Sequence, residues 1–554
     1  MKSPDRLSAS AMERCFILLT ALSLACACAG TTEPSDGGDG SENPSDSANV
    51  VEVSVKTAER APISPYIYGS NQDDGTDVWT VRRYGGNRTT GYNWENNFSN
   101  AGSDYFHHSD SYAITSAHIP TGEAAVPARA LTWFHDQSLA MGAESVVTLQ
   151  MAGYVARDGN GEVAASETAP SARWEKVEPR KGSTFTTTPD LNDGVVYMDE
   201  LVNLIVKRYG TAASSSGIRW YSLDNEPALW SSTHPRIHPN PVGARELVDR
   251  SVALATAVKE VDPTSEIIGP ALYGMAAYVT LQDAPDWNTV RQGSVWFIDY
   301  YLEQMKAAEQ IAGRRLLDVL DVHWYPEARG DHRVVDAAAT TQRDAAARIQ
   351  APRSLWDASY EEDSWIEQVL PQYLPILPRL QMAIDQHYPG THLSVSEYDY
   401  GGGDVISGGL AQADVLGIFG RSGVYLATQW GISEDDRYTS AAFKLYRDYD
   451  GARATFGNTS VSTVSTDPAR SSAYGSIQGS DESILHLVLL NKDSEKTLDF
   501  HIRIEGGASY TAGRAWGFDA NDPRLTERAG VTDIAGNAFE YTVPPLTAIH
   551  LVLR

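Results

Sequence analysis

Two glutamates that lie far apart in the sequence each follow a short apolar segment and could act together as an acid and a base. Glu226 stands in the sequence Asp-Asn-Glu-Pro after the apolar segment 218–223, and Glu397 follows the segment 393–396. A single glutamate in such a place is most often a capping or ion-paired residue. Hydrolysis of a glycosidic bond, however, requires a pair of carboxyl groups, one on each side of the anomeric carbon.

The neighbours of the two glutamates favour different roles for them. Glu226 follows Asn225, whose side-chain amide could bind the 2-hydroxyl of a sugar, a contact that strengthens in the transition state. We therefore predict that Glu226 is the general acid/base and Glu397 the nucleophile. A retaining enzyme of this kind would hold the two carboxyl groups about 5–5.5 Å apart.

The elements that must position these glutamates are short apolar strands alternating with helical segments. The predicted strands are 66–68, 81–84, 146–151, 218–223, 267–269, 319–324, 393–396 and 426–429, and the clearest helical stripes are 198–209 and 247–261. Several strands are continuous apolar runs, which is typical of parallel strands covered on both faces. The pattern predicts an α/β fold, a (β/α)₈ TIM barrel over residues 61–449. Glu226 and Glu397 would then follow its fourth and seventh strands, at the carboxyl ends where reactive groups gather.

Other predicted strand ends carry aromatic and polar residues that suit a sugar. The candidate substrate-binding residues are Asn225, His323, Trp324, Tyr325, Trp430, Arg83, Asn93 and Trp94. Aromatic faces offer apolar area to pyranose rings, and polar side chains can bind the hydroxyl groups. Tyr325 could also donate a hydrogen bond to the nucleophile and keep it ionised. Each of these aromatic residues could instead be an ordinary core residue.

The C-terminal part of the chain has a different pattern. Between Leu498 and Ile504, apolar and polar residues alternate, which predicts a half-buried strand, and the segments 483–490 and 548–553 predict further strands. Residues 450–554 are therefore expected to form an additional all-β domain, a small antiparallel sandwich. Residues 50–60 alternate in the same way and could supply a strand to this sandwich, with the barrel inserted between its parts.

The N-terminus predicts export. Residues 1–28 are expected to be a signal peptide, in which basic residues precede the apolar run 16–25. Cys26, or alternatively Cys28, is a candidate lipidated residue of a bacterial lipoprotein, and a plain secretory signal is the other interpretation. Residues 29–49 are polar and predict a flexible linker. The protein would then be secreted or lipid-anchored at the bacterial cell surface or outer membrane.

Composition argues against several classes of partner. The chain has 554 residues with 44 basic and 72 acidic side chains, a net charge of −28. This charge disfavours nucleic acid and anionic lipid, so we expect no nucleic-acid partner and membrane contact only through the N-terminal anchor. A neutral polysaccharide would not be repelled. The chain has no phosphate-binding glycine loop, serine elbow or His-Glu-x-x-His motif, and carboxylate chemistry requires no cofactor.

Several long motifs resemble glycoside hydrolase family 44. They are GGNRTTGYNWENN (85–97), SLDNEPALW (222–230), THPRIHP (233–239), DVHWYPE (321–327) and SEY (396–398). The resemblance extends over about residues 60–450. It implies a barrel with a β-sandwich and a retaining, endo-acting β-1,4-glucanase or xyloglucanase. It also assigns the acid/base to Glu226 and the nucleophile to Glu397.

The resemblance further implies a structural calcium ion, for which Asp190 and Asp193 are the candidate ligands; both could equally be carboxylates of a helix-entry loop. The expected substrates are xyloglucan, carboxymethylcellulose and mixed-linkage glucan, cleaved by double displacement in an open cleft by a monomer. Two alternatives stay open. One is a non-catalytic carbohydrate-binding surface protein, which the intact glutamate pair disfavours, and the other is the same mechanism acting on xylan or mannan.

Overall fold

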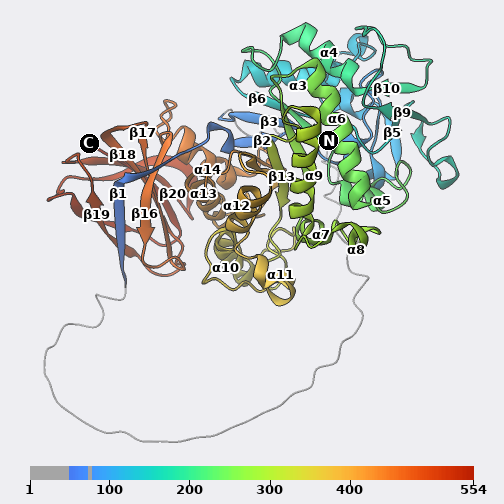
Figure 1. Cartoon of the computed structure of the whole chain (residues 1–554). Helices are drawn as coiled ribbons and strands as arrows, with labels where there is room; N and C mark the ends of the chain where they lie inside the picture. Colours follow the sequence, from blue (N-terminus) through green and yellow to red (C-terminus); the bar gives the residue numbers. More distant parts are fainter. Residues whose placement is uncertain (1–48, 73–77) are drawn as a thin grey trace, which may run out of the picture.

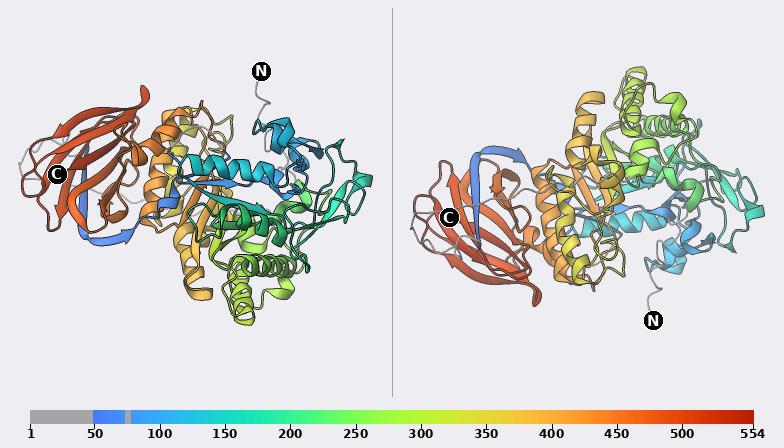
Figure 2. Two further views of the ribbon diagram at one scale, coloured as in Figure 1. Left: turned by 90° about the horizontal axis from the view of Figure 1, so that it is seen from above. Right: turned by 90° about the horizontal axis from the view of Figure 1, so that it is seen from below.

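The computed structural model of the chain describes residues 49–72 and 78–554. It contains a barrel and an all-β unit, which lie beside one another in all three views (Figures 1 and 2). The predicted signal peptide, its cysteines and nearly all of the predicted linker lie outside the described residues. Within the described part of the chain, no helix combines the length and apolar character needed to cross a membrane.

Eight parallel strands close into a barrel, as the alternation of strands and helices predicts. They are β2 (Gly69–Asn71), β3 (Val81–Tyr84), β6 (Glu144–Leu149), β11 (Trp220–Leu223), β12 (Glu266–Leu272), β13 (Val319–Trp324), β14 (His392–Tyr398) and β15 (Leu426–Gln429). The short strand β2 closes the barrel, because Gly69 pairs with Thr428 on one side and Val81 on the other. A Cβ at Gly69 would lie 2.5 Å from the carbonyl oxygen of Ala427, so the close approach requires glycine.

Helices surround the barrel. The longer ones are α3 (Arg129–Ala140), α4 (Met198–Tyr209), α6 (Ala244–Val261), α9 (Phe297–Ala312), α12 (Ile376–His387), α13 (Ile406–Arg421) and α14 (Arg437–Arg447) (Figure 1). The two helices predicted from apolar stripes are therefore present, with α6 beginning three residues before its stripe. Acidic residues in the first turn of α4 and basic residues in its last turn complement the helix dipole.

The predicted first strand is wrong. Residues 66–68 do not join the barrel; Pro65–Ile67 forms a short 3-10 helix, and the strand begins at Gly69. Tyr66 instead packs beneath the barrel, and Ile67 and Tyr68 belong to the main core. The ring of Tyr66 lies edge-on at 4.7 Å from that of Trp220, which belongs to a layer of six buried side chains from six different strands. Burial of the aromatic ring here outweighs its strand propensity.

The all-β unit is one nine-stranded sheet. Its strands are β1 (Val50–Pro62), β16 (Thr459–Ser465), β17 (Ser471–Gln478), β18 (Asp481–Asn491), β19 (Leu498–Glu505), β20 (Gly513–Asp519), β21 (Asp522–Val531), β22 (Ala538–Val543) and β23 (Thr547–Leu553), in the order β21-β20-β23-β18-β17-β16-β1-β19-β22. Buried residues from β19 and β22 share one core with residues from β20 and β23. The sheet therefore folds over on itself and encloses a core, as in a sandwich.

The N-terminal strand β1 lies inside this sheet, so the barrel sequence is inserted between two parts of the all-β unit. It pairs antiparallel with β16 and parallel with β19, and this parallel pair departs from the expected antiparallel pattern. Helix α13 links the two units. Its buried Asp414 accepts a hydrogen bond from the hydroxyl of Tyr474 at 2.5 Å and lies 3.4 Å from the ammonium group of Lys492.

Two small three-stranded sheets belong to the long loops of the barrel. One contains β7 (Tyr154–Ala156), β9 (Trp174–Glu178) and β10 (Val195–Tyr197), and the other contains β4 (Ser99–Asn100), β5 (His108–Asp110) and β8 (Gly161–Glu162). The first lies in the segment that follows β6, and the second joins the segments that follow β3 and β6, on the carboxyl side of the barrel strands. They therefore stiffen the loops around the region where the predicted glutamates lie.

Candidate active site

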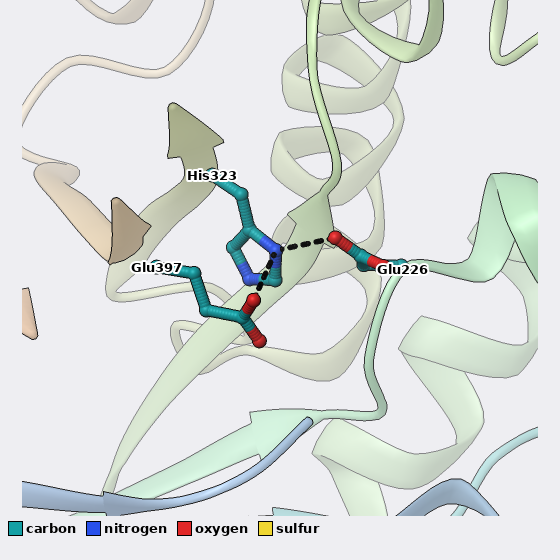
Figure 3. Close-up of side chains that lie close together, drawn as sticks. All are labelled: Glu226, His323 and Glu397. Atoms are coloured by element: carbon teal, nitrogen blue, oxygen red, sulfur yellow. Dashed lines mark hydrogen bonds and ion pairs between the residues drawn. The ribbon is translucent and has the colours of Figure 1, made fainter. Parts of the chain in front are cut away.

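The structure brings Glu226 and Glu397 together. Glu397 is the sixth residue of β14, and Glu226 lies in the turn that follows β11. Figure 3 shows both carboxylates directed toward the ring of His323, which comes from β13. One carboxylate oxygen of each glutamate and a ring nitrogen of His323 all lie within 4.8 Å of one another. This separation is compatible with the 5–5.5 Å of retaining glycosidases and is shorter than the 6.5–9.5 Å of inverting ones.

The turn that presents Glu226 is held by the buried carboxylate of Asp224. This carboxylate accepts hydrogen bonds from the backbone nitrogens of Met151 and Ala152 and from the hydroxyl of Thr90. Asp224 and Glu226 both adopt left-handed backbone conformations, with φ of 61° and 43°. Such conformations cost free energy in non-glycine residues and persist where surrounding contacts impose them. The turn therefore fixes the direction in which Glu226 points.

Glu397 is surrounded by groups that favour its ionised form. Arg83 donates to Oε1 at 2.7 Å and the hydroxyl of Tyr325 donates to Oε2 at 2.8 Å, which is the contact expected of Tyr325. Burial raises the pKa of this carboxyl, but the charges of His323 and Arg83 and the hydrogen bonds of Arg83 and Tyr325 outweigh it. The pKa of Glu397 is therefore lowered. An ionised carboxylate is the state that a nucleophile needs.

The surroundings of Glu226 shift the pKa of its carboxyl in the opposite direction. Burial raises the pKa of its carboxyl, and neither the hydrogen bond nor the charge of His323 compensates, so the pKa stays above its ordinary value. The ring nitrogen Nδ1 of His323 lies 2.8 Å from Oε1 of Glu226 and 3.6 Å from Oε2 of Glu397. Two carboxyl groups whose surroundings push their pKa values apart are typical of an acid paired with a nucleophile.

His323 itself is enclosed. Burial lowers the pKa of its imidazole, but the carboxylates of Glu397 and Glu226 outweigh that effect, so its pKa is raised. Three such groups could also hold a divalent cation. We favour carboxylate chemistry here because Arg83 and Tyr325 already bind both oxygens of Glu397 and because a guanidinium group next to a metal ion would be repelled.

Arg83 connects the two halves of the site. Its second terminal nitrogen donates to Oδ1 of Asn225 at 2.7 Å, so the residue before Glu226 is tied to the partner of Glu397. Arg83 also donates to Asn71, whose amide in turn donates to backbone oxygens of Ser396, Thr428 and Gln429. Sequence reasoning missed Asn71 because it is the last residue of β2, the strand whose position was mispredicted.

The other predicted substrate-binding residues differ in their exposure to solvent. Trp430 is partly exposed, and a Cβ at Gly86 would lie 2.4 Å from its ring, so the indole covers that glycine. Trp324 is almost fully buried. Asn93 and Trp94 are both 0% exposed, and Asn93 donates to Glu175 and to the carbonyl oxygen of Ala156. Asn93 and Trp94 are thus enclosed, as Arg83 and His323 are, and the substrate-binding role of all four stays a prediction.

Tyr273 is a neighbour of Glu226 that was not predicted. It directly follows β12, and the charge of Glu226 adds to burial in raising the pKa of its hydroxyl. Its hydroxyl donates to Gln282. The signal that could have identified it is its place directly after the fifth strand, where the predicted segment 267–269 stopped three residues too early. The expectation of an open cleft stays a prediction.

The predicted calcium ligands are exposed turn residues. Asp190 accepts a hydrogen bond from the backbone nitrogen of Asn192, and Asp193 accepts one from that of Val195. Behind them lie the buried carboxylates of Glu95 and Glu200, each with one oxygen that has no hydrogen-bond partner. Burial, then the charges of Glu175, Asp193 and Glu200, raise the pKa of Glu95 to about 8. A divalent cation could neutralise this cluster of carboxylates.

Comparisons with known proteins agree with the geometry. Residues 98–328 match the model of glycoside hydrolase family 44. Endoglucanase A of Paenibacillus lautus is 54% identical over 92% of this chain and 73% of its own length. A β-mannanase/endoglucanase A of Caldicellulosiruptor saccharolyticus is 49% identical over 90% of this chain, which spans 38% of that longer protein.

Solved structures give the same result. A family 44 endoglucanase from Clostridium thermocellum is 55% identical with a TM-score of 0.90, covering 91% of this chain and 100% of that one. A family 44 xyloglucanase from Paenibacillus polymyxa, solved with xyloglucan, is 52% identical with a TM-score of 0.89, covering 91% of this chain and 99% of that one. The similarity therefore includes both the barrel and the all-β unit.

Proposed function

The chain belongs to glycoside hydrolase family 44, and from that premise we propose that it is a retaining endo-β-1,4-glucanase whose acid/base is Glu226 and whose nucleophile is Glu397. The observation that carries the proposal is the approach of the two carboxylates to within 4.8 Å on opposite sides of the barrel mouth. Glycoside hydrolase activity on β-glucans follows from the close relatives.

Catalysis would proceed in two displacements. In the first, Glu397 attacks the anomeric carbon, the bond to the leaving sugar breaks, and Glu226 transfers its proton to the departing oxygen. In the second, the now ionised Glu226 removes a proton from water, which attacks the same carbon and releases Glu397. The lowered pKa of Glu397 and the raised pKa of Glu226 give each group the protonation state that its first step requires.

A panel of polysaccharides tests the substrate. We expect internal cleavage of xyloglucan, carboxymethylcellulose and mixed-linkage glucan, seen as a rapid fall in viscosity with few reducing ends. Relatives carry the names endoglucanase, β-mannanase and xyloglucanase, so xylan and mannan belong in the panel. Release of monosaccharide alone would contradict endo action. Binding to xyloglucan with no reducing ends released would instead support the non-catalytic alternative.

The pH dependence should report the surroundings of Glu397. Activity requires Glu397 ionised and Glu226 protonated, so it falls below the pKa of the first and above that of the second. In Arg83→Gln the guanidinium group that lowers the pKa of Glu397 is lost, and we expect the acidic limb of kcat/KM to move to higher pH by more than the basic limb does. Arg83→Lys, which keeps the charge, should move it less. If the acidic limb of Arg83→Gln does not move, and its far-UV circular dichroism matches that of the wild type, Glu397 is not the group whose ionisation sets that limb.

We propose that a structural calcium ion binds at the carboxylates of Glu95, Glu200 and Asp193. The unpartnered oxygens of Glu95 and Glu200 fit a cation that prefers oxygen ligands, although Lys181 already binds the other oxygen of Glu200 at 2.5 Å. When calcium is added back to chelator-treated protein at about 100 times its Kd, binding should stabilise the fold by about 2.7 kcal/mol. We expect the Tm to rise by several degrees as a result. Asp193→Asn should reduce this gain and Asp190→Asn should keep it. Equal Tm values with and without calcium would contradict the site.

Export, lipid anchoring at Cys26 or Cys28, and a monomeric state are further proposals. The N-terminal sequence supports the first two, and a catalytic pair supplied by one chain supports the third. Mass spectrometry of the mature N-terminus would distinguish a lipid-modified cysteine from a plain cleaved signal.

A further inference from the structure

An exposed aromatic cluster lies on a loop that hydrogen bonds link to the catalytic pair, and the proposed mechanism does not use it. Tyr105 and Phe106 are 50% and 64% exposed, and with Tyr112 they are the only aromatic residues among the large apolar side chains exposed on the described part of the chain. The rings of Tyr105 and Phe106 meet edge to face at 5.3 Å, and that of His108 lies 5.0 Å from Tyr105. Such a clustered exposed patch usually marks a binding surface.

The backbone holds these rings outward. Phe106 and His107 both adopt left-handed conformations, with φ of 48° and 54°, which is unfavourable for bulky side chains. The preceding helix η3 (Gly102–Tyr105) packs on α5 (Trp230–Thr233), which follows Glu226 in the chain. A Cβ at Gly102 would lie 2.2 Å from the carbonyl oxygen of Thr233, so the two segments are in close contact. The rings are therefore presented by a rigid loop.

A short series of contacts joins this loop to the catalytic centre. Asp104 accepts a hydrogen bond from Asn87 at 3.3 Å, and Asn87 accepts one from Asn225, the neighbour of Glu226, at 3.4 Å. The charge of Glu397 also contributes to the raised pKa of Asp104, after burial. The loop that carries the aromatic cluster is therefore connected to the catalytic pair through Asp104, Asn87 and Asn225.

We propose that Tyr105, Phe106 and His108 form an outer subsite that binds a glucose unit of the β-glucan backbone beyond the sugars at the scissile bond. Aromatic faces and edges suit the apolar faces of pyranose rings, and the hydroxyl of Tyr105 and the ring nitrogens of His108 can bind sugar hydroxyls. This subsite rests on the proposed function, since it takes the same substrate. It gives the enzyme preference for long chains over short ones.

Kinetics on long and short substrates tests the subsite. For Phe106→Ala and for Tyr105→Ala/Phe106→Ala we expect KM on xyloglucan or carboxymethylcellulose to rise roughly three- to tenfold. The kcat/KM on an aryl β-cellobioside, too short to reach the cluster, should stay within twofold of the parent. Ile311→Ala, at a side chain 90% exposed on α9, is the matched control and should change neither value.

The outcomes separate the two proposals. An unchanged KM on polymers, or an equal loss on both substrates, would overturn the subsite while leaving the proposed function intact. Self-association of the parent that is lost in Phe106→Ala, with unchanged polymer kinetics, would assign the patch to a second copy of the chain and also overturn it. A parent that hydrolyses no β-glucan would refute the proposed function; retardation in gels containing xyloglucan would then decide whether Phe106 binds glucan.

Discussion

Glu397→Gln is expected to lower kcat/KM on every β-glucan by on the order of 10⁵-fold or more, because no covalent intermediate can form without the nucleophile. The amide keeps the shape of the carboxyl group and can still accept one hydrogen bond from Arg83 or Tyr325. Loss of activity should therefore occur in a folded protein, and reducing-end assays with far-UV circular dichroism would measure both.

A matched substitution makes this result specific. Glu362 is also a buried glutamate and accepts a hydrogen bond from the hydroxyl of Ser354, but it lies outside the catalytic pair. Glu362→Gln should retain kcat/KM within severalfold of the parent. If Glu397→Gln kept more than about a hundredth of the parent activity, a group other than Glu397 would be the nucleophile.

Glu226→Gln is expected to lose about 10²–10⁴-fold in kcat on natural polysaccharides, whose leaving oxygen needs a proton. On an aryl β-cellobioside with an acidic phenol as leaving group, the first displacement needs little protonation and should stay close to the parent rate. The second displacement still lacks its base, so the glycosyl-enzyme should accumulate.

The accumulated intermediate identifies the acid/base. We expect a burst of phenol followed by slow turnover, and peptide mapping by mass spectrometry should find the sugar on the peptide that contains Glu397. Small-anion nucleophiles that need no base should restore turnover. Equal losses on polysaccharide and activated glycoside, with no burst, would mean that Glu226 does not protonate the leaving group.

The catalytic pair was predictable because its signal is local. Asp-Asn-Glu-Pro and Ser-Glu-Tyr directly follow apolar segments, and the carboxyl ends of barrel strands converge, so Glu226 and Glu397 could be brought together without knowledge of any side-chain contact. The alternation at Val51, Val53 and Val55 likewise placed β1 in the C-terminal sheet. Its parallel pairing with β19 could not be predicted. Alternation shows which side chains of a strand are buried, but it does not show which strand lies next to it.

The errors have a common physical cause, which is burial decided by tertiary packing. Residues 66–68 have strand propensity, but the ring of Tyr66 packs against that of Trp220 beneath the barrel, and this contact favours the short helix over a strand. The enclosure of Trp94 in the core is likewise decided by packing, and its role toward substrate stays a prediction. Asp224 was recognised only as part of a motif, and its role in holding the turn depends on three donors from separate segments. No pattern in one sequence shows such contacts.

The anomeric configuration of the first product tests the central claim most directly. Proton NMR during the first minutes of xyloglucan or cello-oligosaccharide hydrolysis, before mutarotation, records which anomer forms. Two carboxylates within 4.8 Å of one another predict the β-anomer, because Glu397 occupies the space that an attacking water would need. Initial formation of the α-anomer would show single displacement by water and would contradict the nucleophilic role of Glu397.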